Sequence, residues 1–208
     1  MKVKYTRFFL PILILFHLIG LVLFMLPNRV EGLSGLNMLL CASLVFLASD
    51  HYKKEAALLA FVFVSGFLVE FIGVNTGLLF GTYSYGNELG WSIGEVPYVL
   101  GLNWYCIVAA SAHLVYRYLP NLAFAVQAIL IGLICTFMDF LIEPVAMHYD
   151  FWDWQDHIIP ISNYICWAIF ATIFGAVYLR YTTKINATAI QLYFIWFIFF
   201  LILNIFII

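Results

Sequence analysis

Residues 56–74 read AALLAFVFVSGFLVEFIGV, an apolar run of nineteen residues in which Glu70 is the only charged side chain. A run of this length crosses the roughly 30 Å hydrocarbon core of a bilayer as an α-helix. A carboxylate at the centre of such a helix costs about 2.5 to 3.5 kcal/mol on insertion scales, so it faces a bundle interior rather than lipid. The stretch therefore predicts a membrane helix that carries part of a polar site.

The rest of the chain repeats this apolar pattern. Of its 208 residues 65% are hydrophobic and 10% are charged, a composition typical of an integral membrane protein and not of a soluble domain. We therefore predict an all-α, polytopic transmembrane helix bundle that forms one integral membrane domain over residues 1–208 and binds no nucleic acid. Seven apolar runs are expected to cross the bilayer, near 8–26, 33–49, 56–74, 97–118, 122–142, 159–179 and 187–208.

The basic residues indicate how these runs are oriented. With seven crossings and a cytoplasmic N-terminus, eight of the nine Lys and Arg residues fall on the cytoplasmic side, and only Arg29 does not. This distribution follows the positive-inside rule and predicts a multi-pass protein of the plasma membrane. The two longest loops, 76–96 and 144–158, are then both expected outside. The first run is expected to be a retained span, since no small-residue cleavage site follows it.

Two helix faces combine small residues with acids. Gly66, Glu70, Gly73 and Gly77 share one face of the run 56–74, and Gly132, Thr136, Asp139 and Glu143 share one face at the end of the run 122–142. Small residues let helices approach closely in lipid, so we expect these two faces to pack toward each other.

The predicted topology places polar residues of four helices at one depth. Glu70, Asp139 and Glu143 lie toward the outer ends of their runs, and Asn103 and Asn163 open the two runs that return inward. We expect these groups to converge in the outer half of the bundle. Two other interpretations stay open: Glu143 is a water-exposed helix end with Pro144 marking the stop, and the tryptophans and tyrosines near the loops form an interfacial aromatic belt.

Residues 70–90, EFIGVNTGLLFGTYSYGNELG, are the most specific stretch of the chain. Together with Val96-Pro97, Asn103-Trp104, DFLIEP at 139–144, YDFWDW at 149–154 and IPISNY at 159–164 followed by Trp167, they resemble the membrane-embedded carotenoid biosynthesis hydratases of the CruF type. The resemblance is collinear over roughly residues 60–170. It implies a bundle of seven or eight spans that adds water across the terminal double bond of an acyclic carotenoid end group to give a tertiary alcohol, with no redox cofactor or oxygen. We predict no metal site.

The resemblance also implies a set of site residues and partners. Acyclic or monocyclic carotenoid is the expected substrate, the lipid bilayer surrounds the protein, and association with other enzymes of carotenoid synthesis is expected. The predicted substrate-binding residues are Asn75, Tyr83, Tyr85, Asn103, Trp104, Trp152, Trp154, Asn163, Tyr164 and Trp167.

The three acidic residues suit this chemistry independently of the resemblance. Hydration of an alkene requires a proton donor, a surface that stabilises the tertiary cation, and a directed water molecule, and buried carboxyl groups in different environments can divide the acid and base roles. We interpret Asp139 as the acid and Glu70 and Glu143 as candidates for the base or for positioning of water, an assignment that is open to permutation. Indole and phenol rings attract a cation to their faces.

Other classes remain as alternatives. A non-catalytic carotenoid-binding, lipid-binding or transport protein would use the same polar faces as a groove or path. A metal site in the loop that holds His148, Asp150, Asp153, Asp156 and His157 matches no established ligand spacing. The scattered histidines do not favour an iron hydroxylase, and the last run carries no lysine for a retinal Schiff base.

Overall fold

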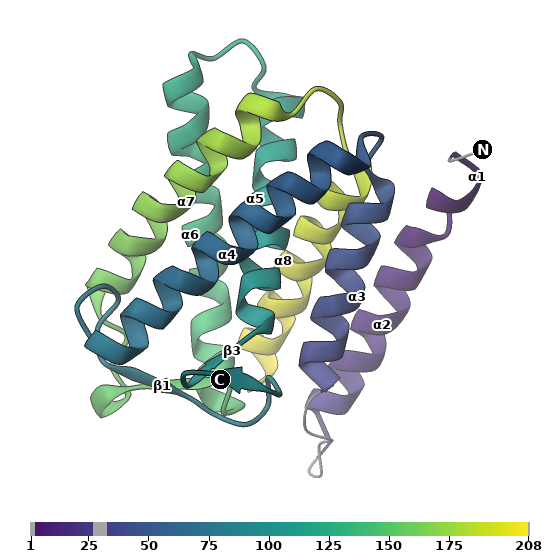
Figure 1. The fold of residues 1–208 in the computed structure, drawn as a ribbon. Coiled ribbons are helices and arrows are strands. Elements are labelled where there is room, and N and C mark those ends of the chain that lie inside the picture. Colours follow the sequence, from purple (N-terminus) through teal and green to yellow (C-terminus); the bar gives the residue numbers. More distant parts are fainter. Residues whose placement is uncertain (1–2, 27–32, 208) are drawn as a thin grey trace.

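The computed structural model describes residues 3–26 and 33–207. Its helices are α1 (Val3–Thr6), α2 (Phe9–Phe24), α3 (Leu33–Ala48), α4 (Tyr52–Thr76), α5 (Val99–Tyr118), α6 (Phe124–His148), α7 (Ile161–Tyr181) and α8 (Ala187–Ile207), with a short 3₁₀ turn η1 (Gln155–His157). The strands are β1 (Tyr83–Tyr85), β2 (Ser92–Ile93), β3 (Val96–Pro97) and β4 (Trp152–Trp154). Each predicted apolar run overlaps one helix of the bundle, although α4 begins before its run and α6 ends after its run (Figure 1).

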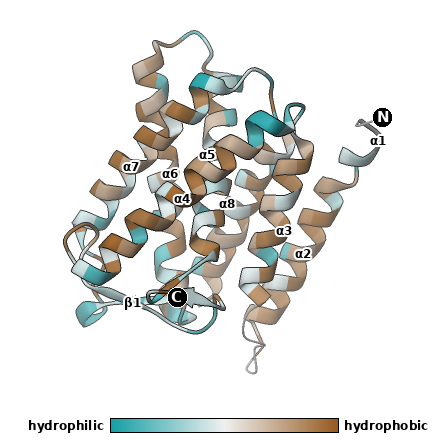
Figure 2. Cartoon of the chain, viewed as in Figure 1, coloured by the Kyte–Doolittle hydropathy of each residue, from teal (hydrophilic) through white to brown (hydrophobic). Residues whose placement is uncertain are grey.

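Five helices, α4 to α8, are long and apolar enough to cross a membrane, and the apolar helices α2 and α3 are shorter, at 16 residues each. Hydrophobic residues line the helices, and hydrophilic residues gather toward the ends of the bundle (Figure 2). The outward faces are apolar too: Ile161, Ile165, Ile169 and Ile173 repeat every fourth residue along α7 and are each at least half exposed. This arrangement identifies a helical membrane protein. Lys2 and Arg29, two of the basic residues from which the orientation was predicted, lie outside the described residues.

Helix α5 is the centre of the bundle. Every residue from Val99 to His113 is buried, and α5 contacts α3, α4, α6, α7 and α8. Its polar residues, among them Asn103 and Trp104, therefore face other helices on all sides.

The end of α6 differs from one interpretation of the sequence. Helix α6 continues through Pro144 to His148, and Glu143 is only 1% exposed, so Glu143 is not a water-exposed helix end. Proline lacks the N–H that would bond the carbonyl of Phe140, which removes one hydrogen bond without ending the helix. Transmembrane helices tolerate this loss where neighbouring groups compensate for it.

Contrary to the prediction, the two small-residue faces do not pack against each other. Gly66 on α4 lies against Trp104 of α5, and Gly132 on α6 lies against Ala168 and Thr172 of α7. The main partner of α4 is α5, and that of α6 is α7. The acids of α4 and α6 are consequently brought together by side chains between them and not by direct helix contact.

Candidate active site

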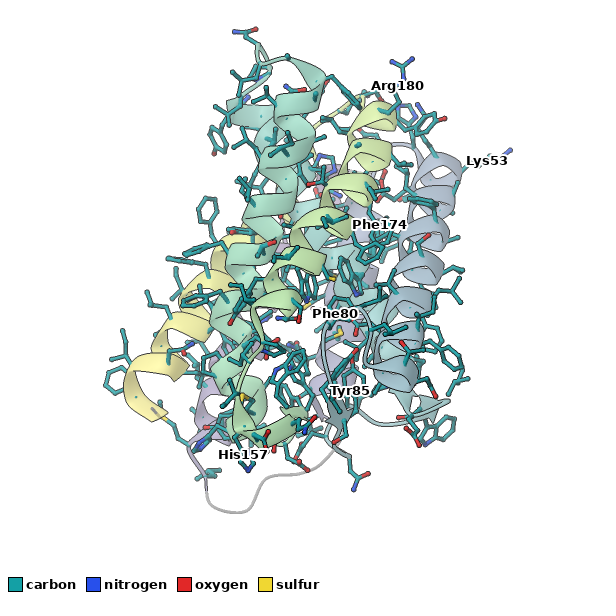
Figure 3. All side chains as sticks on the ribbon, turned by 90° about the vertical axis from the view of Figure 1, so that its left-hand side faces the viewer. Lys53, Phe80, Tyr85, His157, Phe174 and Arg180 are labelled. Atoms are coloured by element: carbon teal, nitrogen blue, oxygen red, sulfur yellow. The ribbon has the colours of Figure 1, made fainter. Side chains whose placement is uncertain are left out.

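A pair of short strands covers one end of the bundle. Strands β1 and β4 pair antiparallel, with Tyr83 opposite Trp154 and Tyr85 opposite Trp152. Because side chains alternate along a strand, these four rings share one face, and Ser84 and Asp153 share the other. The ring centroids of Tyr83 and Trp154 are 4.8 Å apart, and those of Tyr85 and Trp152 are 6.1 Å apart. Figure 3 places Tyr85 and His157 at this end of the molecule and Lys53 and Arg180 at the opposite end.

Glu70 of α4 receives three hydrogen bonds beneath this strand pair. The hydroxyl groups of Tyr83 and Tyr85 donate to its Oε2 at 2.7 and 2.8 Å, and the indole N–H of Trp104 donates to its Oε1 at 2.9 Å. The whole residue is 4% exposed. Three donors replace the water that burial removes, so Glu70 is held in one orientation between a loop strand and the central helix.

The position of Trp104 depends on a glycine. A Cβ atom built on Gly66 would lie 2.6 Å from the Cβ of Trp104, closer than any side chain tolerates. Trp104 also stacks on Trp167 of α7, with ring centroids 3.8 Å apart and planes inclined by 9°. Gly66 and Trp167 thus fix the indole that binds Glu70.

Glu143 of α6 receives three N–H donors. The indoles of Trp152 and Trp154 donate to its Oε2 at 2.9 and 2.7 Å, and the side-chain amide of Asn163 donates to its Oε1 at 2.9 Å. Both tryptophans come from β4, so the strand that carries two of the stacked rings also clamps this carboxyl group.

Asp139 lies one turn before Glu143 and is 2% exposed. Among the described residues its hydrogen-bond donor is Asn163, whose Nδ2 donates to its Oδ2 at 2.9 Å. One amide nitrogen therefore bridges the two carboxyl groups of α6. Glu70 is close enough for its charge to act on both of them. We call Glu70, Asp139 and Glu143, with the side chains that bind them, the carboxyl cluster.

The structure brings most of the predicted site residues to this cluster. Tyr83, Tyr85, Trp104, Trp152, Trp154 and Asn163 bind its carboxyl groups, and Trp167 supports Trp104. Asn103 is buried on α5 and borders an apolar cavity together with Trp152.

Two predicted residues make no hydrogen bond to the carboxyl cluster among the described residues. The amide of Asn75 donates to the backbone carbonyls of Phe71 and Gly94, so it holds the loop to the end of α4. Tyr164 packs on Phe140, a side chain that is 55% exposed on the outer surface of α6. In the loop that was considered for a metal site, His157 pairs with Asp153 at the surface. Within the described residues, no group of three His, Cys, Asp or Glu side chains is arranged to hold a metal ion.

A fourth buried carboxyl group, that of Glu55, was not predicted from the sequence. Glu55 accepts the hydroxyl groups of Tyr105 and Tyr178 at 2.6 and 2.5 Å, at the opposite end of α4 from Glu70. It follows Lys53 and Lys54, and this charged triplet is typical of a loop. The helix begins at Tyr52, which moves Glu55 into the bundle.

Alkaline pH is expected to destabilise the protein through the strand pair. Burial, followed by the charge of Glu70, raises the pKa of Tyr83 and of Tyr85 above the ordinary value of 10.0. A raised folded-state pKa gives stability that is complete below about pH 10 and is lost as pH rises further, by up to about 1.4 kcal/mol per pH unit per tyrosine.

The double variant Tyr83→Phe/Tyr85→Phe is therefore expected to lose stability less steeply between about pH 9 and 11. Unfolding in detergent over this range measures the slope. The control replaces Tyr118 and Tyr181, which are 63% and 53% exposed, and should keep the wild-type slope. Equal slopes for the Tyr83/Tyr85 variant and wild type would contradict the proposal that these two tyrosines cause the loss of stability at alkaline pH.

Comparison with known proteins identifies the family of this chain. The model of a family described as carotenoid biosynthesis protein matches residues 32–208. The bisanhydrobacterioruberin hydratase of Haloarcula japonica is 30% identical over 111 residues, which cover 50% of this chain and 38% of the relative. This match thus spans less than two thirds of the relative's length, and no solved structure matches the chain. Since the family model covers most of the sequence, the chain belongs to the carotenoid biosynthesis protein family.

Proposed function

We propose that this protein is a cofactor-independent carotenoid hydratase, a hydro-lyase that adds water to the terminal double bond of an acyclic carotenoid end group. The observation that carries the proposal is the carboxyl cluster: three buried acids at one end of an apolar bundle, each held by uncharged donors. Family membership and the hydratase relative supply the carotenoid, and the cluster supplies acid–base groups.

We further propose seven crossings of the plasma membrane with the N-terminus inside, within a single membrane domain. Lys53 and Arg180 lie at the end of the molecule opposite the strand pair (Figure 3). The basic end would face the cytoplasm and the strand pair the outside.

The number of donors distinguishes the three acids. Glu70 and Glu143 each accept three hydrogen bonds, which stabilise a carboxylate, whereas Asp139 accepts one, from Asn163. No Lys or Arg within the described residues pairs with the cluster, so three negative charges there would be costly. Asp139 is the group best placed to keep its proton and to act as the general acid.

The proposed reaction begins with transfer of the Asp139 proton to the terminal alkene carbon, which forms a C–H bond and a tertiary cation. The Glu143 carboxylate takes a proton from water as the water oxygen bonds to the cation. The proton then returns from Glu143 to Asp139, so that one water molecule has been added in total. Glu70 lies near both groups, and its carboxylate stabilises the positive charge.

Pigment analysis tests this function. A bacterium that makes lycopene is transformed with the gene, and the extracted pigments are analysed by mass. The expected product is heavier than lycopene by one water molecule and carries a hydroxyl group on the tertiary carbon of its end group. Unchanged lycopene in cells that contain the folded protein would instead favour the alternative of a non-catalytic carotenoid-binding or transport protein.

A further inference from the structure

The side chain of Asn103 lies on the central helix α5 and has no hydrogen-bond partner among the described residues. The residue is 6% exposed, so its amide is removed from bulk water. An amide carries two N–H donors and a carbonyl acceptor, and burial without partners is unfavourable for all of them. Such a group inside a bundle indicates a bound polar molecule, since buried polar groups are rarely left unpaired.

The Asn103 amide opens onto an apolar cavity of about 300 Å³ between α2, α3, α5 and α8. Two other polar atoms of the wall have no partner within the described chain, Nε2 of His17 and Oδ1 of Asn37, but both are sealed beneath the wall surface. Neither polar atom of the Asn103 side chain is sealed in this way, so the cavity reaches its amide. The amide therefore offers both a donor and an acceptor to a molecule in the cavity.

The same cavity borders the carboxyl cluster. Ile142, which precedes Glu143 on α6, and Trp152, whose indole N–H donates to Glu143, both line the wall with Asn103. The next residue of α5 after Asn103 is Trp104, another donor to the cluster. A small molecule held by the Asn103 amide would thus lie at the edge of the cluster, on the side of Glu143.

Glu143 has room for one more donor on one of its two oxygens. Its Oε2 accepts two indole N–H groups, from Trp152 and Trp154, whereas its Oε1 accepts one, from Asn163. Each oxygen of a carboxylate provides about two acceptor positions. Oε1 therefore keeps a position that can accept a hydrogen and then take the proton.

The cavity also reaches the end of the bundle that carries the strands. Ser34, in the first turn of α3, and Glu88, in the loop between β1 and β2, line the cavity and are both partly exposed. The start of α3 lies at the same end of the molecule as the strands (Figure 1). Water can enter the cavity from this end without crossing the apolar faces of the helices.

These features select water as the molecule that Asn103 binds. A hydrocarbon cannot pair an amide, and an anion is disfavoured beside three acids. Water pairs with both the donor and the acceptor of an amide and needs little space. We propose that Asn103 is a further catalytic residue, which holds the water molecule that attacks the carotenoid cation. The inference rests on the proposed function, in which the source of this water was left open.

The role of Asn103 fits the proton balance of the proposed reaction. One hydrogen of the water bonds to Oδ1 of Asn103 and stays on the oxygen, where it becomes the hydrogen of the product hydroxyl group. The other hydrogen passes to Oε1 of Glu143 while a lone pair of the water oxygen forms the C–O bond. Asn103 neither gains nor loses a proton, so its contribution is to fix the position and direction of the water.

A matched pair of variants tests this role. Threonine and valine have the same shape, and only threonine has a hydroxyl group that can bind water, so Asn103→Thr and Asn103→Val differ in that property alone. Purified protein in lipid nanodiscs of increasing lycopene content gives kcat and KM for hydration, measured by pigment mass. The Val variant is expected to have a kcat at least about tenfold below that of the Thr variant, the effect of one hydrogen bond, with the same KM.

The smaller pair Asn103→Ser and Asn103→Ala repeats the comparison with side chains that cannot clash with the wall, and serine should give the higher kcat. Asn87→Val, on an exposed loop residue, is the control and should keep the wild-type values. Equal kcat within both pairs would overturn the inference, and so would a raised KM with unchanged kcat in the Val variant, which would assign Asn103 to carotenoid binding. A wild type that leaves lycopene unchanged would instead reject the proposed function itself.

Discussion

Replacement of Asp139 by asparagine is expected to reduce the yield of hydrated carotenoid at least about a hundredfold, the lower end of what a general acid contributes. Asparagine has nearly the shape of aspartic acid, and an amide cannot give a proton to an alkene. The helix face and the packing of α6 are retained in this variant, so the loss should be in chemistry and not in folding. Pigment mass analysis of the lycopene-producing host, normalised to membrane-extracted protein, measures it.

The matched control is Asp156→Asn, the same change on a loop residue that is exposed and lies in the η1 turn. It should give the wild-type yield. Glu143→Gln is expected to lower the yield as well, because an amide cannot take a proton from water and because in either orientation its NH2 group faces an N–H donor of the indoles or of Asn163. A wild-type yield of hydrated carotenoid from the Asp139 variant would contradict the role of general acid proposed for this residue.

Replacement of Gly132 by alanine is expected to destabilise the protein by about 1 to 3 kcal/mol, the usual cost of overpacking. The added Cβ would meet the hydroxyl group of Thr172 and lie 2.7 Å from the backbone carbonyl oxygen of Ala168. The hydroxyl can rotate away, but the carbonyl belongs to the α7 backbone, so α6 and α7 must separate. In an ordinary helix interior the same change stabilises by roughly 0.5 to 1 kcal/mol, so the expected sign is reversed.

Gly20→Ala in α2 provides the comparison. Its Cβ would meet only the ring of Phe199, at 3.4 Å, which is ordinary contact. This variant should unfold at the wild-type temperature or slightly above it, whereas the Gly132 variant should unfold lower in the same detergent. Because Asn163 on α7 reaches both acids of α6, separation of these helices should also reduce hydration. Equal melting temperatures for the two variants would contradict the close approach of α6 and α7.

Much of the fold follows from local sequence patterns. Apolar runs predicted the positions of all the main helices, because the bilayer requires every spanning segment to satisfy its own backbone hydrogen bonds. The end of α6 was placed too early, at Ile142, since a proline ends most helices in water but is tolerated where neighbouring groups compensate. The start of α4 was placed too late because Lys53, Lys54 and Glu55 are typical of a loop.

Most residues of the candidate site were predictable from the sequence, but the strand pair and the hydrogen bonds that join them were not. The expected depth in the membrane placed Glu70, Asp139 and Glu143 together with Asn163, and the resemblance added Trp104. The hydrogen bonds bring these residues into one cluster. The strands β1 and β4, three residues each, are separated in the sequence by all of α5 and α6 and exist only through their pairing. No local pattern specifies such a pair.

The shared amide of Asn163 has a consequence for the whole reaction cycle. Its nitrogen lies 2.9 Å from Asp139 and 2.9 Å from Glu143, and it has two hydrogens, one for each. In the proposed cycle a proton leaves one carboxyl group and another arrives on its neighbour, so the same pair exists in two charge arrangements. Asn163 can serve both arrangements without rotating. The scaffold would then be equally organised before and after the chemical step, and little reorganisation energy is required between turnovers.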